Sequence, residues 1–184
     1  MKRIRFNDAL LQTRKFVDGE LSVIVDVAID PAGKESVERD GQYFVFSDGT
    51  RIHCRYSEKD CVAVVMSYKN AGLPERVFGM MRGWSDRRFV DALYMPHRFV
   101  VEKVRCVRVQ DLTEEEILRA GVRKNAGGKY MAGGVAGGVY GSAVGAWKAL
   151  YCQMLRVPYA LNPWVIVYEV TPLLGDVNAY GRKG

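Results

Sequence analysis

Hydrophobic residues fall in short runs separated by polar turns along most of the chain, and this pattern predicts a protein built mainly from β-strands. Five runs have the length and the β-branched content of strands: residues 1–7, 21–29, 61–66, 98–109 and 164–171. The run at 61–66 is apolar without interruption, which is typical of a strand buried on both faces. We therefore expect it at the centre of the sheet.

A further pair of runs predicts a β-hairpin. Residues 42–46 and 50–56 flank a polar turn that ends at Gly49, and glycine readily adopts the positive φ that tight hairpin turns need. The preceding stretch, residues 31–41, is polar and is expected to form a loop.

Three short helices are expected. Residues 8–14 predict an opening helix, and residues 146–155 place large apolar side chains three and four apart, as one buried helical face requires. The clearest signal is a capping box in which Thr113 and Glu116 bond each other's backbone amides, with a stop at Gly121. We expect that helix to serve the fold rather than chemistry.

Two long segments lack a regular pattern. Residues 68–95 contain several glycines and predict a long loop with a helical turn near residues 85–92. Residues 123–145 include eight glycines between Gly127 and Gly145, so ordering this segment costs much backbone entropy. It is expected to be a mobile excursion.

Composition bounds the class of protein. The chain has 184 residues, of which 48% are hydrophobic and 26% charged, as expected for one packed domain rather than a disordered chain. The basic start is not followed by the apolar segment that a secretory signal requires, so secretion is not expected, and the glycine-rich segment is too short and too weakly apolar to predict a membrane helix. The four cysteines form no C-x-x-C pair, which indicates buried free thiols in a cytoplasmic protein. No association with a membrane is expected.

The order of several segments resembles phage-type members of the ASCH family, within the PUA-like superfamily. Five segments carry the resemblance. They are the Arg-Lys pair after an opening helix (14–15), the tripeptide that ends the buried strand (67–69), the segment that leads into the next strand (93–98), the capped helix (112–122) and the last strand (162–169). The resemblance implies an α+β fold, a PUA-like mixed β-barrel of five or six strands with flanking short helices. One domain would span residues 1–172, with insertions near 25–51 and 123–145, and residues 173–184 would form a flexible tail.

The resemblance also implies a function. ASCH proteins are generally thought to bind RNA, and some cleave RNA or hydrolyse a modified cytidine. The active members share a threonine after the Arg-Lys pair, a further threonine and a glutamate in the capped helix. Here Phe16 follows Lys15, and Ala120 lies near the expected position of the acid. These departures argue against hydrolysis.

A basic cleft is therefore the first hypothesis, with RNA or a nucleotide as the ligand. The chain has a net charge of +6, and residues 76–108 contain eight Lys and Arg side chains against three acids. Cations that meet phosphates and rings that stack on bases are the groups that single-stranded RNA sites use. The candidate ligand-binding residues are Arg14, Lys15, Tyr68, Lys69, Arg98, Trp84, Arg87 and Arg88.

Two alternatives stay open. A small hydrolase acting on a modified nucleoside or RNA would use Lys15 as its catalytic residue, assisted by His97 or Asp18. A phage accessory protein would act through protein contacts, with the glycine-rich segment ordering on a partner. The sequence shows no metal-ligand spacing and no P-loop, so neither a metal nor a cofactor is expected.

Overall fold

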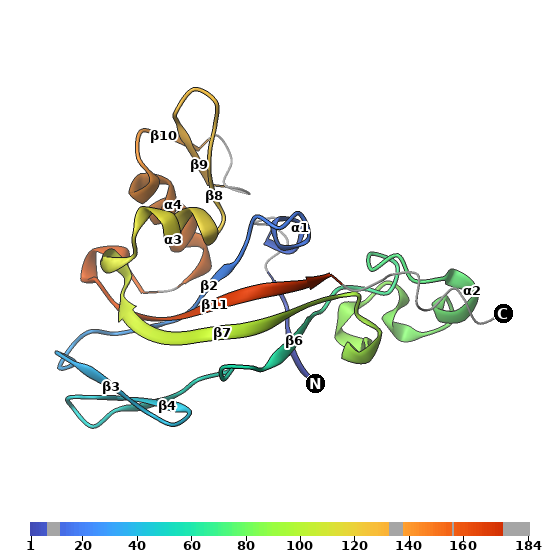
Figure 1. Ribbon diagram of the computed structural model, residues 1–184, viewed down its shortest axis with the longest axis horizontal. Coiled ribbons are helices and arrows are strands. Elements are labelled where there is room, and N and C mark those ends of the chain that lie inside the picture. The colour runs from blue at the N-terminus through green and yellow to red at the C-terminus, as the bar shows by residue number, and fades with distance from the viewer. Residues whose placement is uncertain (7–11, 133–137, 156, 175–184) are drawn as a thin grey trace.

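The principal sheet of the protein has five strands, in a computed structural model that describes residues 1–6, 12–132, 138–155 and 157–174 (Figure 1). Their spatial order is β1 (Lys2–Ile4), β6 (Cys61–Val64), β7 (His97–Arg108), β11 (Trp164–Leu174) and β2 (Val23–Ile29). β1 runs parallel to β6 and every other pairing is antiparallel. The buried β6 is thus an inner strand as expected, although β7 occupies the centre.

Two three-stranded sheets flank the principal sheet. One contains β3 (Val37–Asp40), β4 (Tyr43–Phe46) and β5 (Arg51–His53), with the expected hairpin turn at Gly49, whose φ is +82°. The expectation of a loop over residues 31–41 is wrong for residues 37–40, which form the polar and mostly exposed strand β3 paired with β4. Strands at a sheet edge need little apolar content, so hydrophobic pattern alone does not find them.

The second small sheet lies in the glycine-rich segment. β8 (Val122–Lys124), β9 (Tyr130–Ala132) and β10 (Val139–Tyr140) pair antiparallel, and the β8–β9 turn closes through Asn125 and Lys129. The described part of this segment is therefore an ordered sheet and not an excursion from the fold; residues 133–137 lie outside the described residues.

Hydrophobic cores lie on both faces of the principal sheet. Along β11, Ile166 and Tyr168 belong to one core, whereas Val165 and Val167 belong to the other, as the alternation of side chains along a strand requires. The second core is covered by α3 (Glu114–Arg119) and α4 (Ala143–Met154) (Figure 1). β11 is thus buried on both sides, whereas the core residues of β6, Val62 to Val64, all belong to the first core, so the expectation that this strand is buried between two cores is not met.

The capped helix α3 forms as the sequence predicts. The Thr113 hydroxyl accepts from the Glu116 amide at 3.3 Å, and a Glu116 carboxylate oxygen accepts from the Thr113 amide at 2.9 Å. Gly121 follows the helix with φ +108°. The expected helix at residues 146–155 also forms, but α4 begins earlier because Ser142 caps it by accepting from the Gly145 amide.

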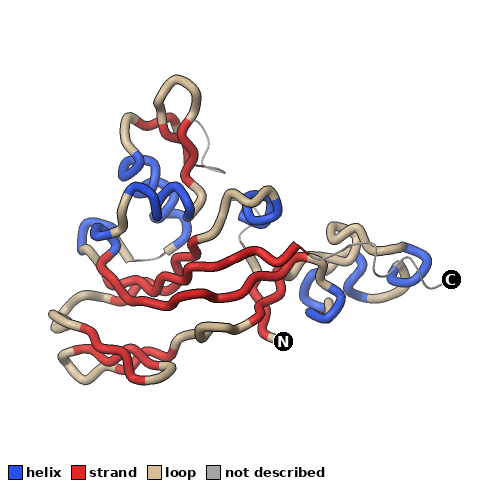
Figure 2. Tube along the Cα trace, viewed as in Figure 1, coloured by secondary structure: helices blue, strands red, loops and turns tan. Residues whose placement is uncertain are grey.

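Residues 67–96 form a lobe at one end of the principal sheet, with short helical turns in place of the expected long loop (Figure 2). The turns are α2 (Glu75–Phe78) and three 3-10 turns, η2 (Arg82–Trp84), η3 (Arg87–Phe89) and η4 (Ala92–Tyr94). We refer to residues 67–96 as the lobe.

Tyr68 organises the lobe. Its amide donates to the Gly83 carbonyl at 2.9 Å, and its hydroxyl accepts from the Asp91 amide at 2.8 Å. Its ring packs against Phe78 and Tyr94, with ring centroids 5.0 and 6.2 Å away. Because Tyr68 is only 1% exposed, the lobe is built around this side chain.

The α+β class expected from the sequence is confirmed, with eleven strands in three sheets among the described residues. In that part of the chain β1 and β2 are the two edges of the principal sheet, and no strand pairing closes it. The expected tail begins too early, since Leu173 and Leu174 continue β11 opposite β7; residues 175–184 lie outside the described residues. No helix of the described residues is long and apolar enough to span a membrane.

Candidate nucleic-acid interface

Lys15 is enclosed within the protein. It lies on α1 (Gln12–Val17), is 2% exposed, and donates from Nζ to the carbonyl of Gly121. Burial and the nearby Arg123 lower the pKa of the Lys15 ammonium, whereas Glu20 opposes the shift. A methyl group on Gly121 would lie 3.1 Å from Nζ, so the two residues are in tight contact. The amine is therefore turned inward toward the end of α3, away from any dissolved ligand.

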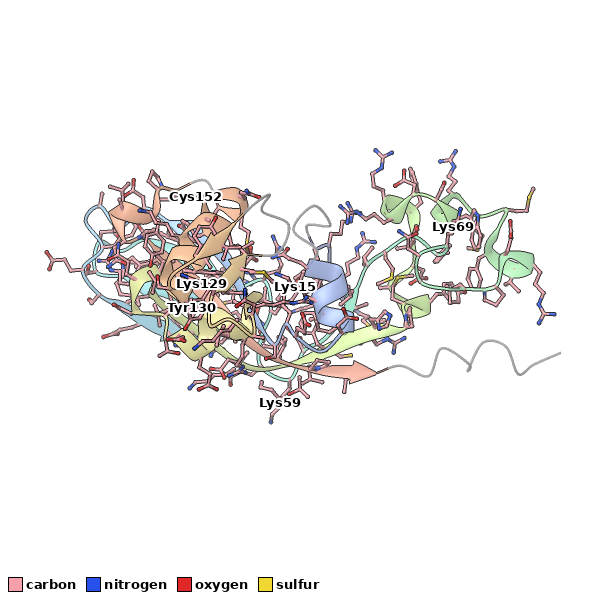
Figure 3. All side chains as sticks on the ribbon, turned by 90° about the horizontal axis from the view of Figure 1, so that it is seen from above. Lys15, Lys59, Lys69, Lys129, Tyr130 and Cys152 are labelled. Carbon is pink, nitrogen blue, oxygen red and sulfur yellow. The ribbon has the colours of Figure 1, made fainter. Side chains whose placement is uncertain are left out.

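The cleft expected from Lys15 and the residues after the buried strand is not assembled. Figure 3 shows Lys15 on α1 beside the principal sheet and Lys69 in the lobe, well separated along the molecule. Figure 1 shows the same separation between α1 and α2. Arg14 also lies on α1, with its side chain outside the described part of the structure, and Asp18 is exposed just after that helix. The opening helix and the lobe are thus two separate places.

Two of the predicted ligand-binding arginines, Arg87 in the lobe and Arg98 just after it, bond backbone carbonyls. Arg98 donates to the carbonyls of Leu93 and Met95 at 2.9 and 3.3 Å. Arg87 donates to the Phe6 carbonyl at 3.1 Å, which ties the lobe to the chain after β1. These side chains stabilise the lobe, and sequence alone did not distinguish them from ligand-binding cations.

Two aromatic candidates are also part of the packing. Tyr68 is buried, as described above, and Trp84 is half-buried against the same core. Lys69 by contrast is exposed, and its amide donates to the Trp84 carbonyl at 3.1 Å. Of the predicted ligand-binding residues in the lobe, Lys69 and Arg88 keep exposed cations.

An exposed ring with two guanidinium groups near it is the most distinctive surface feature of the lobe. Phe89 is 52% exposed, and the Arg82 and Arg88 guanidinium carbons lie 5.6 and 5.7 Å from its ring centroid. Arg88 is also paired with Asp86 at 2.7 Å, which lowers the pKa of that carboxyl group. Sequence reasoning missed Phe89 and Arg82, although arginines interleaved with aromatic residues over 82–89 were the available signal.

A hollow of about 560 Å³ opens beside Phe89. Its charged lining consists of Arg3 from β1 and Asp91 from the lobe, and its aromatic lining of Tyr68, Phe89 and Tyr94. We call it the aromatic hollow. Among the described residues no carboxylate pairs with Arg3 or with Arg82, so two cations at this surface are available to an anion.

A second, smaller cavity of about 180 Å³ lies where β1, β2 and α1 meet. Its polar lining consists of Arg5, Gln12, Asp26 and Arg55, and its apolar lining includes Met154. An Asp26 carboxylate oxygen lies 3.4 Å from Nη1 of Arg55, and this proximity contributes to a raised pKa of Arg55. We call it the Asp26 pocket. No sequence motif pointed to it.

The remaining candidates lie elsewhere. His97 begins β7, and burial lowers the pKa of its imidazole. The described residues contain no group of three or more potential metal ligands. The expectation of buried thiols is met at Cys54 but is wrong at Cys61 and Cys152, which are exposed. Comparison of the chain with protein-family models, with curated proteins and with solved structures found no match.

Proposed function

We propose that this protein binds single-stranded RNA or a nucleotide through the surface of its lobe. The observation that carries this proposal is the exposed Phe89 ring with Arg82 and Arg88 beside it, at the rim of the aromatic hollow. A base stacks on an aromatic face without any sequence requirement, and neighbouring guanidinium groups meet its phosphates.

The charge around the ring favours an anionic ligand. Arg3 on β1 and Arg82 on the lobe are exposed cations, and Lys69 is a further exposed cation of the lobe. Contacts of this kind release counterions from a nucleic acid, so the affinity falls as salt is added. A single-stranded ligand fits better than a duplex, because only an unpaired base can leave its stack for the ring.

The two alternatives gain different support. Catalysis by Lys15 is not favoured, since the amine is enclosed against Gly121 on a helix that lies apart from the lobe (Figure 3). Protein contact has one observation in its favour: Val77, Met80 and Leu93 are exposed on the lobe, and Met80 fully so. Exposed apolar residues beside arginines are typical of protein interfaces. Binding to the lobe by an acidic, apolar protein segment is the second candidate function.

Membership of the ASCH family, with a PUA-like barrel, is part of the proposal. Three features support it: the mixed five-stranded sheet, the helix α1 after the first strand, and the capped helix α3 that follows the long β7. The barrel would require further strand pairing at the edges formed by β1 and β2. An experimental structure in which both edges stay open would remove this part of the proposal.

Fluorescence anisotropy with a 5′-labelled oligoribonucleotide tests the function. Phe89→Ala removes the stacking face, and since base stacking on an aromatic ring contributes about 1–3 kcal/mol, affinity should fall between about fivefold and 150-fold. The matched control is Tyr43→Ala, because Arg51 lies 4.8 Å from that ring on a different sheet. The control should bind like the wild type.

The salt dependence supplies a second measurement. Arg82→Gln should lower the slope of log affinity against log salt by about 0.7, the value for one phosphate of a single strand. Wild-type protein that shows no binding at low salt, or binding indifferent to salt, overturns the proposal. Equal losses in Phe89→Ala and Tyr43→Ala would mean that the lobe is not the site.

A further inference from the structure

The first strand joins the two cavities. Ile4 and Phe6 are buried in the core. Arg3, which precedes Ile4, and Arg5, which lies between the two, are exposed. The pairing with β6 continues to this point, since the Val65 amide donates to the Ile4 carbonyl at 2.9 Å. The alternation shows that residues 3–6 are extended and that Arg3 and Arg5 project to the same side.

Each of these arginines serves a different cavity. Arg3 lines the aromatic hollow and Arg5 lines the Asp26 pocket. Residues i and i+2 of an extended chain are about 6.7 Å apart. The guanidinium groups of Arg3 and Arg5 therefore reach different phosphates of one nucleic-acid strand. Arg87 of the lobe donates to the Phe6 carbonyl, which fixes the lobe against the segment that joins the cavities.

The Asp26 pocket has the chemistry of a base site rather than a phosphate site. A carboxylate accepts hydrogen bonds and repels phosphate, so Asp26 suits a group that presents N–H donors. Arg55 places Nη1 3.4 Å from the same carboxylate, so the pocket presents a cation beside its acceptor. A volume of about 180 Å³ is below that of sites for whole drug-sized ligands and suits one ring system.

From this arrangement we infer that the ligand is a strand of at least two nucleotides that runs along residues 3–5, with one base on Phe89 and another, carrying an exocyclic amino group, in the Asp26 pocket. The inference rests on the proposed function and deepens it. Adenine, cytosine and guanine carry such an amino group, whereas uracil does not. The protein therefore reads a short single strand, and selects bases at one end of it.

Chain length and base identity test the inference separately. The probes are AMP, UMP and labelled tetranucleotides of adenylate or uridylate, titrated at one low salt concentration. Wild-type protein should bind the adenylate tetranucleotide at least tenfold more tightly than AMP, because only the longer probe reaches both cavities. It should also prefer the adenylate to the uridylate tetranucleotide.

Two variants locate these effects. Arg5→Gln should weaken tetranucleotide binding severalfold and leave AMP binding at the aromatic hollow unchanged. Asp26→Asn replaces an acceptor by a group that both donates and accepts, so the preference for adenylate over uridylate should fall to within twofold. The matched controls are Arg51→Gln and Asp40→Asn, an exposed ion pair at 2.7 Å on the β3–β5 sheet, and both should behave like the wild type.

The outcomes separate this inference from the proposed function. Suppose that binding depends on salt and is lost in Phe89→Ala. If the affinity is then equal for AMP and the tetranucleotides, or is unchanged in Arg5→Gln and Asp26→Asn, the inference of a nucleic-acid strand along β1 is overturned and the lobe remains a nucleotide site. Absence of salt-dependent binding to every probe removes both. Circular dichroism of each variant shows that the fold is retained.

Discussion

The contact between Tyr68 and Gly83 is the part of the lobe most sensitive to a small change. A Cβ atom at Gly83 would lie 2.5 Å from Cε2 of the Tyr68 ring and 3.0 Å from Cζ. The ring has no room to withdraw, because Phe78 and Tyr94 pack against it and its hydroxyl accepts from the Asp91 amide. Gly83→Ala therefore forces the backbone or the ring to move.

The cost follows from overpacking. One extra methyl group in a well-packed site destabilises by about 1–3 kcal/mol, and for a chain of this length each kcal/mol lowers Tm by about 2–4 °C. We expect Gly83→Ala to lower Tm by roughly 2–12 °C. Hydrogen exchange should quicken first at the amides of Tyr68 and Asp91, whose bonds depend on the ring position.

Gly141→Ala is the matched control, because its Cβ atom would meet nothing within 4 Å and its φ is not positive. It should leave Tm unchanged or raise it by up to about 4 °C, since an alanine in open space clashes with nothing and lowers the conformational entropy of the unfolded chain. A Gly83→Ala protein as stable as Gly141→Ala, with unchanged exchange at Tyr68 and Asp91, would refute the argument that the lobe is built around this contact.

Three other changes test the fold and its buried groups. Folding lowers the pKa of Lys15 from 10.5. Between the folded pKa and 10.5 the unfolded chain therefore binds more protons than the folded protein, and the wild-type free energy of unfolding rises with pH. Lys15→Met should keep the fold and abolish this rise in urea titrations. Burial likewise lowers the pKa of His97 from 6.5, so wild-type stability should fall as pH drops from 6.5 through the folded pKa, and His97→Gln should flatten that part of the curve. Thr113→Ala removes the acceptor of the Glu116 amide and should cost about 0.5–2 kcal/mol in urea unfolding, whereas Thr113→Ser should cost much less.

Each of these expectations has a contrary result. A Lys15→Met protein that keeps the wild-type dependence on alkaline pH would show that another group causes it. An unchanged acid limb in His97→Gln would exclude the imidazole as the group that titrates there. Equal stability of Thr113→Ala and the wild type would mean that the capping box contributes nothing measurable.

Local signals in the sequence determined much of the secondary structure. The capping box at Thr113 and Glu116, the hairpin turn at Gly49 and the apolar strand at residues 61–66 each form as predicted. Such features depend on residues close together in the chain, whose hydrogen bonds and dihedral angles are nearly independent of the rest of the fold. The α+β class follows from the same local patterns.

The tertiary structure alone decided which charged side chains are available to a ligand. Lys15, Arg98 and Arg82 are all basic side chains in the sequence. In the structure Lys15 is buried against Gly121, Arg98 bonds backbone carbonyls, and Arg82 is exposed beside Phe89. A cation's role depends on which acceptors the fold brings to it, and those acceptors come from distant parts of the chain. The glycine-rich segment shows the same dependence, because packing of β8 and β9 on α4 supplies the contacts that offset its entropy.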